Sequence, residues 1–306
     1  MPASTSELLA AARQHQIPGT VAVEAASGGH VVVRLTGPQA EAEILLHGAH
    51  VWHWQPRGAA PVLWRSPRTV WQAGTPMRGG IPICWPWIGR RPDAPLHGPV
   101  RTVPWTLART ALAADGAVEA VLTLDGEALP PGPWPKRFRL ELSVRAGAAL
   151  DVGLTCTNPN DAAIVHAGAL HTYLALGDAR QAAIHGLGGL DYHQPEQYET
   201  WIRDAESVLH CTGAEINRTY RDVGPAKPVV IEDPVLRRRL RIVRHGSAAS
   251  VAWNPGTERS LAVADLGDGA WTGFACIEAV NTEWDARTIA PGSSHRLGTT
   301  LTLEPA

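Results

Sequence analysis

Residues 77–89, MRGGIPICWPWIG, place one arginine at the start of an otherwise apolar run. Arg78 is followed by two glycines, and the nearby segment HGPVR adds His97 and Arg101. Two guanidinium groups can hold a phosphate through bidentate, charge-assisted hydrogen bonds, and glycines let a ligand approach the backbone closely. A lone arginine is more often a solvated charge, but one that borders a core needs a partner. The pattern favours a local anion site.

A second candidate is a carboxylate in an apolar strand, GFACIEAVN. Alternation places Glu278 on the same face as Phe274, Cys276 and Val280. Burial without a partner raises the pKa of a carboxyl group toward the range of a general base. A carboxylate in this setting favours a functional role over a structural one.

A third candidate is a histidine in GALHTYLALGD. In an extended strand, His171 and Tyr173 share one face. An imidazole with a pKa near ~6.5 can donate or accept a proton at physiological pH. Without a catalytic partner nearby, the same histidine would be interpreted as a structural side chain whose hydrogen bonds are satisfied.

Several other kinds of site are disfavoured. His47, His50 and His53 are spaced by threes, so that in a strand the middle ring points away from the outer two and a three-histidine metal site is not expected. GLGGLD lacks the spacing and the following helix of a dinucleotide-binding motif, and there is no GxSxG elbow or P-loop. A glycosidase would need two carboxylates, and only Glu278 stands out. We expect neither a metal nor a cofactor.

The elements that must position these residues are mostly strands. One isolated helix is predicted in residues 4–19, where Ser4 and Glu7 have the spacing of a capping box and Pro18 and Gly19 end the helix. Later segments alternate apolar and polar residues, as in RFRLELSVR, and are separated by Gly, Pro, Asn and Asp. Strands without alternating helices predict an all-β fold, a large antiparallel β-sandwich with a short N-terminal helix.

Residues 1–306 are expected to form a single domain, in which residues 1–19 are an N-terminal helical extension. The 27 basic and 29 acidic residues produce no broad positive field, so neither nucleic acid nor a membrane surface is an expected partner. No apolar run approaches the ~20 residues of a membrane span, and no signal segment is present. We expect a cytoplasmic monomer.

The cysteines and tryptophans have simple expected roles. The four cysteines are scattered without CxxC spacing and are interpreted as buried thiols. The chain has 12 Trp against 4 Tyr and 2 Phe, and many of the tryptophans fall between residues 52 and 105. A tryptophan face can stack on the C–H face of a sugar, or it can simply pack in the core.

Taken together, RGGIPICWPWIG, HGPVR, ALHTYLALGD, VAWNPG and FACIEAVN occur in an order and spacing that resemble bacterial glucose-6-phosphate 1-epimerases. These enzymes belong to the aldose 1-epimerase, or galactose mutarotase-like, superfamily. The resemblance extends from about residue 20 to the end of the chain. It implies a β-supersandwich with a sugar cleft, and an isomerase that interconverts the α and β anomers of hexose 6-phosphates.

The resemblance also implies roles for individual residues. His171 corresponds to the general acid of the family and Glu278 to its general base. Arg78 and Arg101 correspond to arginines assigned to the phosphate, and His97 would lie beside the sugar.

One substrate-binding position departs from the family pattern. The family usually carries an aspartate that contacts sugar hydroxyls, whereas this chain has Asn217 before Arg218. Asparagine can still accept and donate hydrogen bonds, but it brings no charge.

The residue types suit ring opening, which needs one proton removed from the C1 hydroxyl and one delivered to the ring oxygen. One carboxylate and one imidazole suffice. Two alternatives remain open: a mutarotase for unphosphorylated aldoses, which would not need Arg78 and Arg101, and a non-catalytic carbohydrate-binding protein that uses the tryptophan-rich surface.

Overall fold

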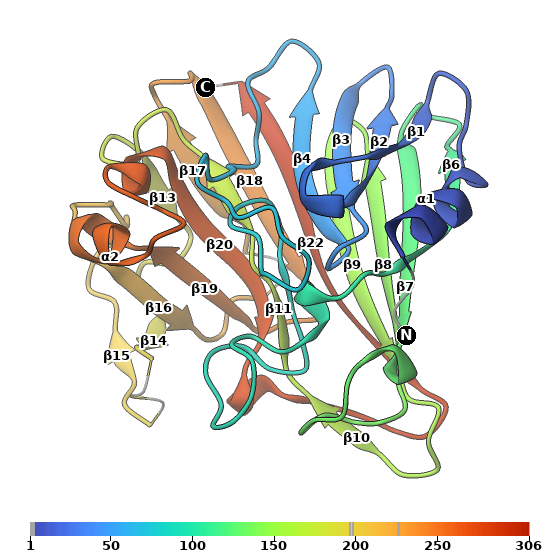
Figure 1. Cartoon of the computed structure of the whole chain (residues 1–306). Coiled ribbons are helices and arrows are strands. Elements are labelled where there is room, and N and C mark those ends of the chain that lie inside the picture. The colour runs from blue at the N-terminus through green and yellow to red at the C-terminus, as the bar shows by residue number, and fades with distance from the viewer. Residues whose placement is uncertain (1–3, 196, 198, 225–226, 306) are drawn as a thin grey trace.

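The computed structural model describes residues 4–195, 197, 199–224 and 227–305, and these residues form antiparallel sheets with two short α-helices (Figure 1). The helices are α1 (Thr5–Arg13) and α2 (Gly256–Ala262). The 3-10 turns are η1 (Ser27–Gly29), η2 (Val100–Thr102), η3 (Gly126–Ala128), η4 (Ala270–Gly273) and η5 (Glu283–Asp285). The predicted all-β fold with an N-terminal helix is confirmed.

One large sheet forms the first layer. Its strands, in spatial order, are β13 (Ala183–His185), β17 (Val229–Asp233), β18 (Arg238–His245), β22 (Ser294–Pro305), β9 (Ala149–Thr157), β8 (Arg139–Ala146), β7 (Val118–Asp125) and β6 (Thr106–Leu112). Inward-facing residues alternate with outward-facing ones along β8, as the sequence RFRLELSVR predicts. The sheet therefore presents one continuous apolar face to the core.

Two further sheets pack on that face. A four-stranded sheet contains β1 (Val21–Ala25), β2 (Val31–Thr36), β3 (Ala40–Leu45) and β4 (His50–Pro56). The other contains, in spatial order, β15 (Ile202–Arg203), β14 (Asp191–His193), β16 (Ile216–Tyr220), β19 (Ala249–Asn254), β20 (Phe274–Asn281), β11 (Gly168–Leu170) and β5 (Ile83–Cys84), with β12 (Tyr173–Ala175) also paired to β20. A separate ribbon pairs β10 (Ile164–His166) with β21 (Arg287–Ile289).

The layers share one apolar core. β2 and β3 of the four-stranded sheet contact β7 and β8, while β11 and β20 contact β22. Fully buried side chains such as Leu142 of β8 and Ile277 of β20 belong to the same cluster. The interdigitated inner faces of two packed sheets are the core of a β-sandwich.

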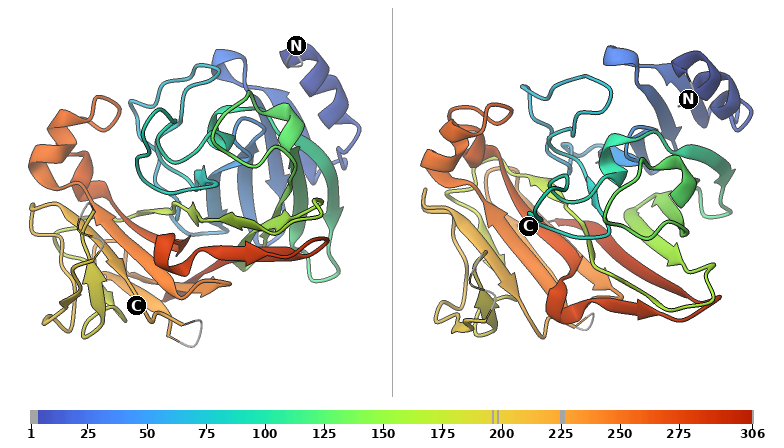
Figure 2. Two further views of the ribbon diagram at one scale, coloured as in Figure 1. Left: turned by 90° about the horizontal axis from the view of Figure 1, so that it is seen from below. Right: turned by 60° about the horizontal axis from the view of Figure 1, so that its bottom comes forward.

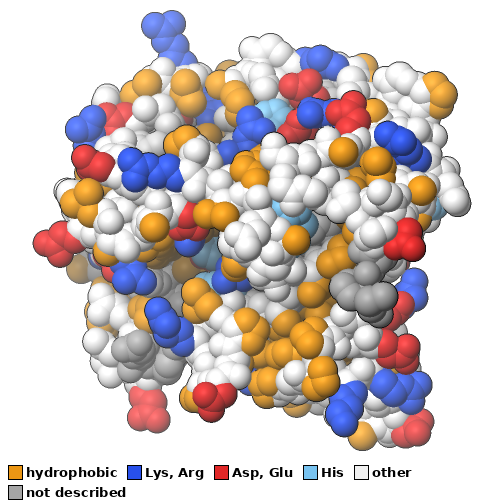
Figure 3. All heavy atoms as spheres, viewed as in Figure 1, with side chains coloured by type: hydrophobic (Ala, Val, Ile, Leu, Met, Phe, Trp, Pro, Cys, Tyr) orange, Lys and Arg blue, Asp and Glu red, His pale blue; other side chains and the backbone are white. Residues whose placement is uncertain are grey.

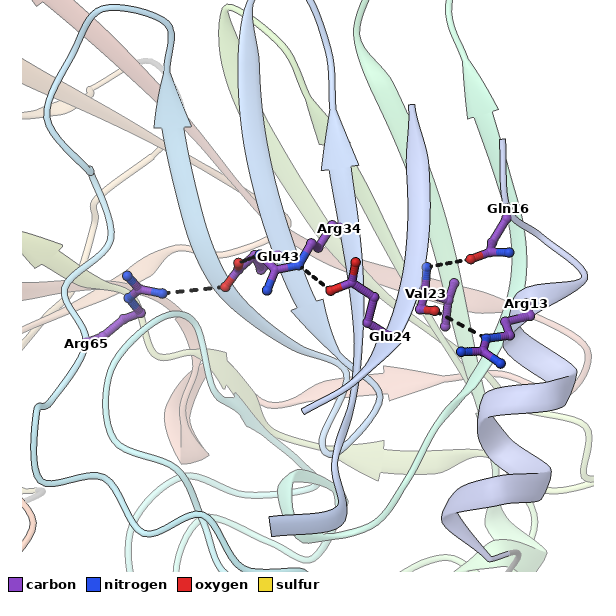
Figure 4. Close-up of polar contacts among 7 residues, drawn as sticks. All are labelled: Arg13, Gln16, Val23, Glu24, Arg34, Glu43 and Arg65. Carbon is purple, nitrogen blue, oxygen red and sulfur yellow. Dashed lines mark hydrogen bonds and ion pairs between the residues drawn. The ribbon is translucent and has the colours of Figure 1, made fainter. Parts of the chain in front are cut away.

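The N-terminal helix covers the free edge of β1. Ser4 caps α1 and forms the predicted capping box with Glu7. Figure 4 shows Gln16 and Arg13 reaching Val23 of β1: the Gln16 side-chain oxygen accepts from the Val23 N–H at 2.9 Å, and Arg13 Nε donates to the Val23 carbonyl at 3.5 Å. These contacts occupy backbone groups that an exposed edge strand would offer to another chain.

The outer face of the four-stranded sheet carries surface ion pairs, also drawn in Figure 4. Arg34 contacts Glu24 and Glu43, and Arg65 reaches Glu43 at 3.5 Å. Exposed pairs of this kind contribute about 0–1 kcal/mol each. Basic and acidic side chains are also interspersed over the face of the molecule in Figure 3, as the balanced composition predicts.

Long loops between β4 and β6 carry the first candidate site residues. Residues 57–105, cyan to teal in Figures 1 and 2, lie between α2 and the four-stranded sheet. Trp54, Trp85, Trp87 and Trp105 are fully buried, so these tryptophans pack in the interior. Of the two described α-helices, neither is long and apolar enough to cross a membrane.

Candidate active site

Strand register brings the predicted acid and base together. Leu170 of β11 pairs with Ala279, and Tyr173 of β12 pairs with Cys276, so His171 falls opposite Glu278 of β20. His171 Nδ1 lies 3.2 Å from Glu278 Oε1. The two groups are not aligned as a hydrogen bond, because Nδ1 has no hydrogen-bond partner among the described residues. The pair is in contact without an aligned hydrogen bond between the two groups.

Burial makes both members of the pair resist ionisation. Burial raises the pKa of Glu278 well above its ordinary value. The pKa of His171 is well below its ordinary value because of burial, with contributions from His97, Arg78 and Arg101. Burial therefore favours the uncharged form of each group.

Arg78 occupies a partly enclosed position with two partners. Its Nε donates to Asp265 Oδ2 at 3.1 Å, and its Nη1 donates to the Tyr173 hydroxyl at 2.9 Å. Burial opposes the charged guanidinium, but Tyr173 and Asp265 outweigh it and hold the pKa of Arg78 above its ordinary value. Asp265 and Tyr173 are thus both partners of the guanidinium at the start of the apolar run, and a role for Arg78 in anion binding stays a prediction.

Tyr173 connects Arg78 to the catalytic pair. Its ring stacks on His171 with centroids 4.8 Å apart and planes at 10°. It also packs on Trp64 and Phe274, with centroids 5.9 Å and 5.3 Å away. The predicted shared face of His171 and Tyr173 is confirmed, and the aromatic packing fixes the spacing between guanidinium and imidazole.

Arg101, in η2, is a second and less compensated cation. Its Nη2 donates to the Leu96 carbonyl at 2.8 Å, and its Nε is buried without a partner. Within the part of the chain that the structure describes, it forms no ion pair with an acidic side chain. Burial lowers the pKa of Arg101, and the neighbouring charge of Arg78 lowers it further. An anion would relieve both effects.

His97 lies beside His171, with ring centroids 5.7 Å apart in an edge-to-face arrangement. Its Nδ1 accepts a hydrogen bond from the Gly89 N–H at 2.9 Å, so the neutral ring carries its proton on Nε2. Burial, together with Arg101 and Arg78, lowers the pKa of His97 to about 3. His97 is therefore a neutral hydrogen-bond donor at physiological pH.

The two glycines after Arg78 serve a purpose that differs from the sequence prediction. Both have positive φ, 111° at Gly79 and 61° at Gly80. A Cβ on Gly79 would come within 2.5 Å of the Trp64 carbonyl oxygen, and one on Gly80 would collide with the Val51 carbonyl. They are required by close approach of the protein's own backbone, and the prediction that they make room for a ligand was wrong.

Asn217 lies on β16 opposite Trp253 of β19, and register places it on the same sheet face as Glu278. Trp253 in turn pairs with Cys276 and meets His171 edge to face at 5.9 Å. The structure thus places Asn217 one strand beyond Trp253. The side chain of Arg218, next in sequence, faces the other way and bonds to Asp204 at 3.0 Å.

Two functional candidates were missed in the sequence. Asp265 contacts Arg78 across 187 positions of the chain, and no local motif in the loop after α2 signals that contact. Trp253 stands in WNPG, where alternation on the strand could have placed it beside Asn217. Among the described residues, no group of three or more His, Cys, Asp or Glu side chains could hold a metal ion.

The comparisons with known proteins all indicate the same family. Residues 31–302 match the aldose 1-epimerase family. A protein from Escherichia coli K12 named "Putative glucose-6-phosphate 1-epimerase" is 32% identical over 247 residues, covering 79% of this chain and 80% of its own. A protein of the same name from Salmonella typhimurium is 31% identical over 248 residues, with the same coverage of both chains.

A solved structure shares the fold over almost the whole chain. The crystal structure described as a "putative mutarotase" from Salmonella typhimurium superposes with a TM-score of 0.85 and 26% identity, covering 95% of this chain and 96% of that one. The sandwich described above is therefore a known type of fold.

Proposed function

This chain belongs to the aldose 1-epimerase family, whose members interconvert sugar anomers, and we propose that it acts on hexose 6-phosphates with Glu278 as general base and His171 as general acid. The protein is an isomerase of the mutarotase type. The relatives named for glucose 6-phosphate support the substrate class. The assignment of each residue is supported by the geometry of the site.

The acid and base roles are supported by the contact between His171 and Glu278. The groups lie 3.2 Å apart in a buried site, where strand register places His171 opposite Glu278 of β20. Burial lowers the pKa of His171 and raises the pKa of Glu278, so that a neutral imidazole and a carboxyl group lie side by side. Throughout the reaction the pair carries one proton in total, either on His171 or on Glu278.

The enzyme neither gains nor loses a proton over the complete reaction. Glu278 carboxylate accepts the proton of the C1 hydroxyl, a C1 carbonyl forms, and the bond from C1 to the ring oxygen breaks as His171 imidazolium protonates that oxygen. Rotation about C1–C2 presents the other carbonyl face. Ring closure then returns one proton to His171 and the other from Glu278 to the new C1 hydroxyl. His97, which carries its proton on Nε2, is placed to donate a hydrogen bond to a sugar oxygen.

The observation that carries the phosphate assignment is the partly exposed guanidinium of Arg101, whose Nε is buried without a partner. It is close enough to Arg78 for their charges to interact, and it lacks an acidic partner among the described residues. A partly buried cation without an acidic partner is a suitable site for a ligand that supplies the counter-charge. A phosphoryl group held between Arg78 and Arg101 would supply it through charge-assisted hydrogen bonds. We assign Asn217 to the sugar hydroxyls, where its amide can donate and accept.

The direct test is anomer exchange of freshly dissolved α-glucose 6-phosphate, followed by NMR or polarimetry. We expect acceleration over buffer and a larger kcat/KM than for glucose. No acceleration would reject the hexose 6-phosphate assignment. Equal kcat/KM values for the two sugars would favour the mutarotase for unphosphorylated aldoses, and saturable sugar binding without exchange would favour a binding protein.

The remaining features of the proposal concern the whole chain. We propose that residues 1–306 act as a single domain and that the protein works as a monomer in the cytoplasm, with a small-molecule sugar phosphate as its partner. Analytical ultracentrifugation of the purified protein tests the monomer. A sedimentation coefficient of a dimer, unchanged on dilution, would contradict it.

A further inference from the structure

The peptide bond between Gly79 and Gly80 is held at both of its polar ends. The Gly79 carbonyl accepts a hydrogen bond from His50 Nε2 at 2.7 Å, and the Gly80 N–H donates to the Trp64 carbonyl at 2.7 Å. A carbonyl oxygen only accepts, so His50 must carry a proton on Nε2. Burial lowers the pKa of His50 to about 3, so the ring stays a neutral donor at physiological pH.

Two adjacent glycines make this peptide easy to rotate. Both have positive φ, 111° and 61°, and glycine moves between backbone regions at little steric cost. A flip of the peptide would turn the Gly79 carbonyl away from His50 and the Gly80 N–H away from Trp64. A Cβ on Gly80 would lie 2.7 Å from His50 Nε2, so the imidazole lies directly against the turn. His50 therefore selects one orientation of a peptide whose own sequence permits more than one.

That orientation determines the backbone on both sides of Arg78. The Arg78 carbonyl accepts from the Ser66 N–H at 3.1 Å, and this bond and the one from Gly80 to Trp64 form a single antiparallel bridge. The Arg78 N–H donates to Thr69 Oγ1 at 2.9 Å. Loss of the bond from Gly80 would break half of the bridge that holds the main chain of the arginine.

The same turn fixes a partner of the Arg78 side chain. The Gly80 carbonyl accepts from the Tyr173 N–H at 2.9 Å, and the Tyr173 hydroxyl accepts from Arg78 Nη1 at 2.9 Å. His50 lies on β4 in the four-stranded sheet, whereas Tyr173 lies on β12 beside β20. The turn thus connects two sheets, and the position of the guanidinium depends on His50 through the main chain.

We propose that His50 is a positioning residue for phosphate recognition, because through the peptide between Gly79 and Gly80 it holds Arg78 where the guanidinium meets the phosphoryl group. This inference rests on the proposed function and deepens it. In this role His50 acts on the affinity for the anion and leaves the proton-transfer groups His171 and Glu278 unchanged.

The test compares His50→Leu with His50→Gln. Leucine removes the donor, whereas the side-chain nitrogen of glutamine can lie close to the position of Nε2 and donate to the same carbonyl. Exchange NMR gives KM and kcat for glucose 6-phosphate, and competition against this substrate gives the inhibition constant of sulfate, a simple dianion. We expect H50L to raise KM and the sulfate inhibition constant at least ~10-fold, the order of one lost contact to a charged group, with kcat within ~3-fold of wild type. H50Q should return both constants to within ~3-fold of wild type.

A merely structural role would give a different result. Loss of folded protein lowers the apparent kcat and leaves KM unchanged, which is the result expected for Tyr220→Phe, since its lost hydrogen bond to Asp204 lies on the opposite face of β16 from Asn217. Wild-type constants in H50L, or equal rises in H50L and H50Q, would overturn the inference while the proposed function stands. Absence of any acceleration of glucose 6-phosphate exchange by the wild type would instead overturn the proposed function.

A second measurement does not depend on whether H50L folds. Long-range proton–nitrogen NMR spectra of the wild-type histidine rings, assigned with H50Q, report which nitrogen of each ring carries the proton. We expect the Nε2–H tautomer of His50 from about pH 5 to about pH 8. The Nδ1–H tautomer would leave the Gly79 carbonyl without this donor and would overturn the inference in the wild type itself.

Discussion

His171 Nδ1 approaches Glu278 Oε1 to 3.2 Å because strand register places them opposite each other, and no aligned hydrogen bond holds them there. The backbone register therefore keeps the two groups adjacent. The register of β12 and β20 thus sets the short distance between the acid and the base. Removing either functional group should leave the other in position.

The first prediction concerns the catalytic pair. Glu278→Gln and His171→Asn should each lower kcat for glucose 6-phosphate at least ~10²-fold with little change in KM, because each removes a proton-transfer group and nearly preserves shape. Exchange NMR at several substrate concentrations measures both constants. Matched controls are the exposed Glu258→Gln and His210→Asn, which should behave as wild type. A near-normal kcat in either site variant would remove its assigned role.

The second prediction concerns Asp265. Asp265→Asn keeps an oxygen that can accept from Arg78 but removes a negative charge beside the phosphate site. The KM for glucose 6-phosphate should fall by about 5-fold, the order expected for a partly screened charge. A higher KM for glucose 6-phosphate would mean that Asp265 serves mainly to orient Arg78.

The sequence contained most of this site. The period-2 pattern of GFACIEAVN and GALHTY predicted which side chains share a face, and the register of β12 and β20 agrees with it. Arg78 and Arg101 could be singled out because a charge next to an apolar run is rare. The helix of residues 4–19 was predictable because its capping box is local.

The features that could not be predicted from the sequence depend on contacts between segments that are far apart in the chain. The ion pair between Arg78 and Asp265 joins a loop after β4 to a loop after α2, and neither segment carries a signal for the other. The role of Gly79 was misassigned because a positive φ has the same sequence signature whether a ligand or the protein backbone approaches it. Strand order in the second layer, with β5 beside β11, likewise depends on tertiary packing.

The third prediction concerns Tyr173. Tyr173→Phe keeps the rings stacked on His171, Trp64 and Phe274 but removes the hydroxyl that accepts from Arg78. Unfolding free energy should fall by about 1–3 kcal/mol, and KM for glucose 6-phosphate should rise several-fold while kcat stays within a few-fold of wild type.

The control for Tyr173→Phe is Tyr220→Phe. The Tyr220 hydroxyl donates to Asp204 at 2.6 Å on the opposite face of β16 from Asn217. Its loss should lower stability similarly in urea unfolding and leave KM unchanged. A fall in kcat for Y173F as large as that for His171→Asn would show that the phenol takes part in proton transfer.

The last prediction links Glu278 to stability. Burial raises the pKa of Glu278 in the folded state above its ordinary value, which applies in the unfolded state. The unfolded chain therefore loses this proton first as pH rises, and wild-type stability falls from about pH 4.5 upward until the folded-state pKa is passed. The Glu278→Gln variant carries no charge at this position at any pH, so its stability does not fall in this way. Urea unfolding should show nearly equal stabilities near about pH 4.5 and a variant that is the more stable of the two near about pH 8.

The stability difference isolates Glu278 because the other buried groups are common to both proteins. His171 is neutral in the fold and titrates in the opposite sense, so its contribution rises with pH up to about 6.5 in wild type and variant alike. Glu258→Gln, at an exposed position on α2, provides the matched control and should give a difference that does not change with pH. A wild-type advantage that grows with pH would mean that Glu278 is stabilised as a carboxylate.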